Sequence, residues 1–286
     1  MTIHPQTRLG PVHLRVADLS KLVTYYTTLG LHLHRRQNRQ AILGDGTTDL
    51  LVLNERPDGQ RVRGTSGLYH FAILLPTRAD LGRALRHFGE SAVPVGGASD
   101  HAVSEALYLT DPEGNGIEVY RDRPRDEWRY PNGQLVINTT PFDVAGVLAA
   151  GDARDGRWDG VPNGTVIGHM HLHVGSIEAA ESFYRDALGF DLISRYGPSA
   201  TFLSAGGYHH HLGANTWAGV GAPPAPENSW GLPHFTIELP GTQALSAVRA
   251  QLERAGVSVT EQEDGYAGGY FVRDPSGNGV LLRSIS

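Results

Sequence analysis

An internal repeat limits what this chain of 286 residues can fold into more than any other feature. The segment SGLYHFAILLP (66–76) recurs as WGLPHFTIELP (230–240), with seven of eleven positions identical. About forty residues after each copy, the segment DPEGNGI (111–117) recurs as DPSGNGV (274–280). Self-similarity of this kind indicates a chain that is built from repeated supersecondary modules.

A different pair of segments extends the repeat. Residues 10–31 and 168–190 both contain His-Leu-x-Val, then a helix-like stretch, and then Leu-Gly. The chain therefore divides into four modules, which span residues 8–57, 66–122, 167–217 and 230–284. We expect two halves, 8–122 and 167–284, joined by a connecting segment at 123–166 that is rich in turn-forming residues.

Each module has the same internal plan. It opens on a short alternating run, such as residues 169–174, that is typical of a half-buried strand. Apolar residues at helical spacing follow, as at Leu81, Leu85 and Phe88, and a glycine such as Gly89 ends the predicted helix. Short strands separated by turns complete a βαβββ module. Because one module cannot cover its own sheet, we expect an α+β fold in which paired modules form two cupped, barrel-like sheets.

Composition argues against several classes of function. A net charge of −6 and a pI near 6.1 argue against a nucleic-acid partner. The chain has no cysteine, which removes disulfides, thiolate metal sites and a cysteine nucleophile. No segment has the apolar length of a secretory signal or of a membrane span. We therefore expect a cytoplasmic protein with no membrane partner, which can form a homo-oligomer.

The motifs resemble those of the vicinal oxygen chelate superfamily, which includes glyoxalase I, bleomycin resistance proteins and extradiol catechol dioxygenases. The resemblance rests on HLRV and HLHV with FYxxxLGF, on the DPxGN turn, and on a histidine triplet (209–211) followed by Leu-Gly. It covers nearly the whole chain and is greatest to the four-module catechol 2,3-dioxygenases of bacilli and actinobacteria. It implies a site in which two histidines and one glutamate hold Fe(II), or sometimes Mn(II).

The resemblance also implies where the metal ligands lie: on the first strands of two paired modules and on the last strand of one of them. The first-strand positions in the four modules are Pro11, His70, His169 and His234. At the last-strand position the second module has Glu118 and the fourth module has Leu281. Only the second and third modules together supply two histidines and a carboxylate, so we expect His70, Glu118 and His169 to bind the metal. The sequence leaves open whether these modules pair within one chain or between two chains.

Further site residues are implied by the same resemblance. His101 and Tyr108 precede Glu118 at positions where the family has a histidine and a tyrosine that bind substrate and oxygen. Phe71 and Trp217 are candidates for an apolar wall against the substrate ring.

The histidine triplet supplies the expected acid/base. Counting back from Leu212, the resemblance assigns this role to His210, and an imidazole suits it because it titrates near neutral pH. We expect the triplet to lie in the last strand of the third module, where alternation turns His209 and His211 away from His210. The sequence leaves open which of the three histidines is the acid/base.

Together these features predict Fe(II)-dependent extradiol cleavage of catechol, or of a substituted catechol, by O₂ to a muconic semialdehyde. Three alternatives within the superfamily stay open. They are a glyoxalase-type metal-dependent lyase or isomerase, a dioxygenase that cleaves hydroquinones, and a metal-free binding module.

Overall fold

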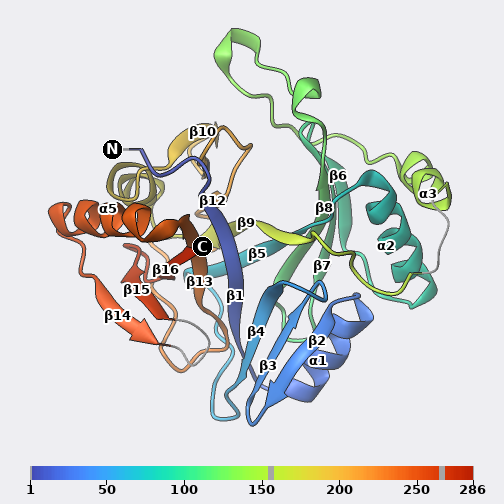
Figure 1. Cartoon of the computed structure of the whole chain (residues 1–286), viewed down its shortest axis with the longest axis horizontal. Helices are drawn as coiled ribbons and strands as arrows, with labels where there is room; N and C mark the ends of the chain where they lie inside the picture. Colours follow the sequence, from blue (N-terminus) through green and yellow to red (C-terminus); the bar gives the residue numbers. More distant parts are fainter. Residues whose placement is uncertain (1, 154–157, 264–267, 286) are drawn as a thin grey trace. The chain divides into compact units, whose positions relative to one another are not determined.

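The computed structural model describes residues 2–153, 158–263 and 268–285, and the chain has an α+β fold (Figure 1). The strands are β1 (Arg8–Val16), β2 (His32–Gln37), β3 (Gln40–Gly44), β4 (Asp49–Glu55), β5 (Gly67–Leu74), β6 (Gly97–Asp100), β7 (Ser104–Thr110), β8 (Gly116–Asp122), β9 (Val166–His173), β10 (Asp191–Tyr196), β11 (Ala200–Ser204), β12 (Leu212–Asn215), β13 (Gly231–Pro240), β14 (Thr260–Glu263), β15 (Gly268–Arg273) and β16 (Gly279–Ile285). The helices are α1 (Leu19–Thr28), α2 (Arg78–Glu90), α3 (Val144–Asp152), α4 (Ile177–Glu181), α5 (Gly241–Arg254), the 3₁₀ turns η1 (Arg125–Glu127) and η2 (Pro131–Gly133), and the π-helical turn η3 (Ser182–Ala187). Within these residues no helix has the length and apolar character that a membrane span requires.

The predicted βαβββ plan is confirmed in all four modules, each of which contributes one strand, a helix and three further strands. The strands form two mixed eight-stranded sheets. One has the order β14-β15-β16-β13-β1-β4-β3-β2 and the other has the order β10-β11-β12-β9-β5-β8-β7-β6. The first module therefore shares a sheet with the fourth, and the second shares a sheet with the third. This is the pairing that the expected metal ligands require.

The chain also separates into two compact units. One comprises Met1–Arg15, Gly59–Tyr69 and His169–Ser286, and the other comprises Val16–Asp58 and His70–Gly168. We call these the first and second compact units. Three of the four boundaries fall inside continuous strands, between Arg15 and Val16 in β1, between Tyr69 and His70 in β5, and between Gly168 and His169 in β9.

The repeated DPxGNG turn explains how a helix and a distant hairpin are held together. The hydroxyl of Tyr26, on α1, donates to Asp111 Oδ2 over 2.8 Å, and the hydroxyl of Tyr184 donates to Asp274 Oδ2 over 3.0 Å. Both phenols are fully buried, and burial together with the neighbouring carboxylate raises the pKa of Tyr26 well above its ordinary value. The two tyrosines therefore remain neutral hydrogen-bond donors, and each half of the chain contains the same link between helix and turn.

The connecting segment contains a helix that the sequence patterns did not predict. In Figure 1, α3 lies beside α2, and the two helices approach closely at Gly82 and Gly151. A Cβ atom on Gly82 would overlap the carbonyl oxygen of Val147, so a larger residue would force the helices apart. Asp143 caps α3 by accepting from Gly146 N over 2.9 Å. The segment therefore packs onto the second module and is not a free linker.

Candidate metal centre

Strand register places two of the predicted ligands side by side in the second compact unit. In the parallel pair β5–β8, Ala72 lies opposite Glu118. Because alternate residues of a strand share a face, His70 projects to the same side as Ala72 and Glu118. His70 Nε2 lies 3.1 Å from Glu118 Oε2, and both residues are buried. A carboxylate withdrawn from water in this way needs a polar or cationic partner.

Tyr108 and His101 adjoin this pair. Tyr108 lies directly across from Glu118 in the antiparallel pair β7–β8, and its ring centroid is 5.9 Å from that of His70. The Tyr108 hydroxyl is 2.6 Å from His101 Nε2, and His101 Nδ1 is 2.8 Å from the carbonyl oxygen of Asn138. The structure thus brings together four residues that the sequence predicted. It adds Asn138, which acts through its backbone and which no side-chain pattern could mark.

A small buried cluster lies on the same face of the sheet. Ala72, Ala106 and Tyr120 form a buried cluster, and Tyr108 packs against it. The last residue of the second compact unit, Gly168, is part of the same surroundings, because a Cβ atom there would overlap the Tyr120 hydroxyl. The residue that follows Gly168 in β9 is His169.

His169 belongs to the first compact unit, where the histidine triplet adjoins it. The ring centroid of His169 is 4.2 Å from that of His210 and 6.1 Å from that of His209. His209 Nδ1 and His210 Nδ1 are 2.8 Å apart, and both residues are buried. Only His211 turns elsewhere, because its Nδ1 accepts a hydrogen bond from Ala205 N over 3.1 Å.

The expectation that the triplet lies in a strand is wrong. The strand β12 begins at Leu212, and the triplet precedes it in a loop. Gly206 and Gly207 have φ angles of 59° and 69° and bend the chain just before the triplet. Strand alternation therefore does not apply there, and His209 contacts His210 instead of facing away from it.

Three buried side chains combine into a donor set for a metal ion. His70, Glu118 and His169 each offer one ligand atom, and these atoms all lie within 4.8 Å of one another. Among the described residues, no other set of three or more His, Asp or Glu side chains has this property. Two imidazoles and one carboxylate suit Fe(II) and also Mn(II), and they leave further coordination sites for other ligands. The residues present therefore fit the metal that the sequence resemblance implies.

The equivalent positions of the other sheet differ in chemistry. His234 lies opposite His13 in the β1–β13 pair, and the two rings stack with centroids 4.1 Å apart. The ring of Phe271 is 6.0 Å from His234, and Leu281 occupies the position that corresponds to Glu118. With an apolar residue in place of the carboxylate, this histidine pair lacks the anionic ligand of the donor set.

A series of aromatic rings runs through the first compact unit from His210 to the surface. The centroid distances are 5.1 Å from His210 to Phe202, 5.7 Å from Phe202 to His171, and 5.5 Å from His171 to Trp217. Tyr69 stands 5.1 Å from Trp217, and both rings are exposed. Trp217 therefore lies among other aromatic rings. Of these, Tyr69 and Phe202 were not predicted from the sequence.

Phe71 has a different placement. Its side chain is fully buried, and its ring lies 6.3 Å from that of Tyr26 in the core. Because it directly follows His70 in β5, it points to the opposite face of the strand. This is the position of a core residue, on the face of β5 opposite to the one that holds His70.

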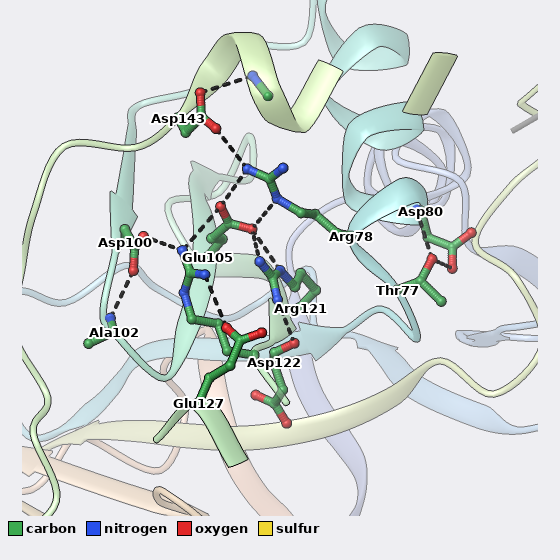
Figure 2. Close-up of polar contacts among 12 residues, drawn as sticks. Thr77, Arg78, Asp80, Asp100, Ala102, Glu105, Arg121, Asp122, Glu127 and Asp143 are labelled. Atoms are coloured by element: carbon green, nitrogen blue, oxygen red, sulfur yellow. Dashed lines mark hydrogen bonds and ion pairs between the residues drawn. The ribbon is translucent and has the colours of Figure 1, made fainter. Parts of the chain in front are cut away.

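A buried charge network supports the strands from their other face. Figure 2 shows Glu105, on β7, between Arg78 and Arg121. Glu105 is fully buried and accepts from Arg78 Nε over 2.8 Å and from Arg121 Nε over 2.6 Å. Arg78 also bonds to Asp143 at the start of α3, over 2.9 Å. Burial opposes ionisation of Glu105, but the hydrogen bonds and charges of the two arginines outweigh it and lower the pKa of the carboxyl.

Comparisons with known proteins agree with this architecture. The sequence profile of the Glyoxalase/Bleomycin resistance protein/Dioxygenase superfamily matches residues 8–119 and 166–282. A catechol-2,3-dioxygenase of Bacillus subtilis (strain 168) is 45% identical over 280 residues, which cover 96% of each chain. Biphenyl-2,3-diol 1,2-dioxygenase 3 of Rhodococcus globerulus is 31% identical over 54% of this chain and 84% of its own. The solved structure of glyoxalase I from Zea mays shares the fold with a TM-score of 0.58 at 17% identity, covering 97% of this chain and 92% of that one.

The substitution Glu105→Gln tests the charge network. Because the folded-state pKa of Glu105 is lowered, its contribution to stability is present above the unfolded pKa and is lost as the pH falls through the folded pKa. We expect Glu105→Gln to lower the free energy of unfolding by about 3 kcal/mol at neutral pH. The difference from the unmodified protein should shrink as the pH falls below about 4. Urea unfolding at several pH values measures this difference in the free energy of unfolding.

The control is Glu127→Gln, which removes an exposed carboxylate 3.5 Å from Arg123 and should change stability little. A loss of unfolding free energy in Glu105→Gln that is equal at acidic and neutral pH would contradict the electrostatic account.

Proposed function

Because the chain belongs to the glyoxalase, bleomycin resistance protein and dioxygenase superfamily, we propose that it is an extradiol dioxygenase. It would cleave catechol, or a substituted catechol, with O₂ to a muconic semialdehyde. The observation that carries the proposal is the buried donor set of His70, Glu118 and His169 beside the Tyr108–His101 pair. The 45% identity to a catechol-2,3-dioxygenase over almost the whole of both chains supports it.

In this proposal His70, Glu118 and His169 hold one Fe(II), and Mn(II) is the alternative. When bound, the metal supplies a Lewis acid and a redox centre at which a catechol and O₂ can meet. The protein contributes a buried site of fixed geometry. Glu118 brings the single negative charge of the ligand set, so the bound cation keeps one net positive charge with which to attract a catecholate.

Tyr108 and His101 would hold a substrate oxygen by hydrogen bonding, because the hydroxyl of Tyr108 lies on the ligand face of the sheet and is tied to His101 over 2.6 Å. The aromatic rings near His210 offer an apolar wall for the substrate ring. Trp217, which is 48% exposed, would form the outer end of that wall.

His210 would carry the proton that leaves and returns to the substrate. The contact between His209 Nδ1 and His210 Nδ1 is made by two ring nitrogens, so one of them must donate and the other must accept. If His210 Nδ1 donates, His210 Nε2 is unprotonated and can act as a base. His209 would then set the tautomer of His210 and would not itself transfer the proton.

Activity is the direct test of this function. Protein that is purified without air and supplied with Fe(II) should consume O₂ on addition of catechol and form a yellow ring-cleavage product. Oxygen electrode and absorbance measurements follow the two together. Oxygen uptake with hydroquinones alone would support the hydroquinone-cleaving alternative, and conversion of a glyoxalase substrate without oxygen uptake would support a lyase.

Metal content tests the ligand assignment separately. The purified protein should hold about one Fe(II) or Mn(II) per chain. Each of His70→Ala, His169→Ala and Glu118→Ala should abolish loading, because two ligands hold the ion too weakly. His234→Ala is the matched control, since it changes the corresponding histidine of the other sheet and should leave the metal content intact. Loss of metal in His234→Ala and its retention in His70→Ala would show that the assignment is wrong.

His210→Gln tests the acid/base role. Glutamine retains hydrogen bonding but does not titrate near neutral pH, so the variant should keep its metal and lose about a hundredfold in kcat. His211→Gln is the control, because the His211 ring accepts from Ala205 N and not from the residues around His169. This substitution should lower kcat much less. If His211→Gln removes the metal while His210→Gln is nearly silent, the roles within the triplet have been misassigned.

A further inference from the structure

His101 is held between two partners of different chemistry. It lies in the turn that joins β6 to β7, and its ring bridges the carbonyl oxygen of Asn138 and the hydroxyl of Tyr108. The distances are 2.8 Å from Nδ1 to the carbonyl oxygen and 2.6 Å from Nε2 to the hydroxyl. Asn138 belongs to the connecting segment, and all three residues lie in the second compact unit.

The chemistry of these partners determines which nitrogen carries the proton. A backbone carbonyl can only accept a hydrogen bond, so His101 Nδ1 must be protonated. In the neutral ring Nε2 is then unprotonated and accepts the hydrogen bond from Tyr108. The Tyr108 hydroxyl therefore donates to His101, and its oxygen can in addition accept a hydrogen bond.

We propose that the Asn138 carbonyl fixes the tautomer of His101, and that Asp100 is a positioning residue that holds the turn in which this occurs. Tyr108 is thereby set as a hydrogen-bond acceptor for a substrate hydroxyl. This inference rests on the proposed function for its link to catalysis, but the tautomer itself is a property of the chain.

Three sets of contacts around Asp100 hold the turn. The backbones of Asp100 and Thr140 exchange hydrogen bonds of 3.1 and 2.9 Å, which ties the connecting segment to the end of β6. The Asp100 carboxylate accepts from the backbone nitrogen of Ala102 over 2.8 Å and from Arg123 over 2.5 Å. Figure 2 shows the first of these carboxylate contacts. His101 stands between Asp100 and Ala102 in the sequence, so the hydrogen bond from Ala102 N to the Asp100 carboxylate spans it.

The turn needs such support because its backbone is strained. Ala102 has a φ of 66°, in the left-handed region that residues other than glycine adopt at a cost. The hydrogen bond from Ala102 N to Asp100 offsets that cost. Arg123 also lies 3.5 Å from Glu105, so the turn is connected to the buried charge network. Without the Asp100 carboxylate, the ring of His101 would lose its alignment with the Asn138 carbonyl.

Nitrogen NMR reads the tautomer without any dependence on turnover. Full-length protein labelled with ¹⁵N in histidine and loaded with Zn(II), which is diamagnetic, should show His101 with a protonated Nδ1 and an unprotonated Nε2. The signals are assigned by their loss in His101→Gln. A protonated Nε2 with an unprotonated Nδ1 in the unmodified protein would overturn the proposal.

Variants of Asp100 test the positioning role. Asp100→Ala removes the acceptor for Ala102 N, so His101 should become a mixture of tautomers and kcat for catechol should fall about tenfold or more. Asp100→Asn retains an acceptor oxygen and should restore both the tautomer and most of kcat. Glu127→Ala, which removes a different carboxylate from Arg123, is the control and should change neither.

The two levels of the proposal can fail separately. An unchanged tautomer in Asp100→Ala would refute the positioning role. If the unmodified protein shows the expected tautomer and Asp100→Ala disturbs it, but catechol is not cleaved, then the proposed function fails and the structural inference stands.

Discussion

The burial of Glu118 is the constraint on which the rest of the site depends. Its carboxylate is 3% exposed in a strand where both sequence neighbours, Ile117 and Val119, are buried apolar residues. Removing an ionised carboxylate from water costs several kcal/mol unless other groups compensate for the lost hydration. The side chains on the same face accordingly include His70 at 3.1 Å and Tyr108 directly across the sheet. A divalent cation would satisfy the carboxylate and the imidazoles together, which no purely apolar packing could do.

The internal repeat allows the two sheets to be compared at the position of Glu118. Both sheets are built from the same module, and both have a histidine on the first strand of an even-numbered module, His70 in the second and His234 in the fourth. In the second case Leu281 replaces the glutamate, and the histidine stacks on His13. The scaffold contacts, such as Tyr26 to Asp111 and Tyr184 to Asp274, are alike in both halves. The repeat thus retains the contacts that hold the modules together, whereas the donor set differs.

Much of the fold was predictable because hydrophobic periodicity and the repeat both act locally. Alternating and helical patterns identified the βαβββ modules, and the family resemblance, applied to the aligned repeats, implied His70, Glu118 and His169 as a ligand set. The placement of the triplet was missed because two glycines with positive φ, Gly206 and Gly207, end the regular backbone just before it. Periodicity carries no information once the backbone leaves the strand.

Other features were beyond sequence reasoning for a different reason. The role of Asn138 depends on a backbone carbonyl, which every residue has, so its identity gave no signal. The network around Glu105 joins residues as far apart in sequence as Arg78 and Asp143, and only the folded chain brings them into contact. Both features lie around the site and are not part of its ligand set. Sequence motifs carry the least information about such surrounding contacts.

The central claim is that the metal lies with the second and third modules and not with the histidine pair of the other sheet. Anomalous diffraction from crystals of the Fe(II)-loaded protein, recorded on both sides of the iron edge, locates the ion directly. We expect one anomalous peak within bonding distance of His70, Glu118 and His169. A peak beside His234, or iron bound to the histidine triplet without Glu118, would contradict the account.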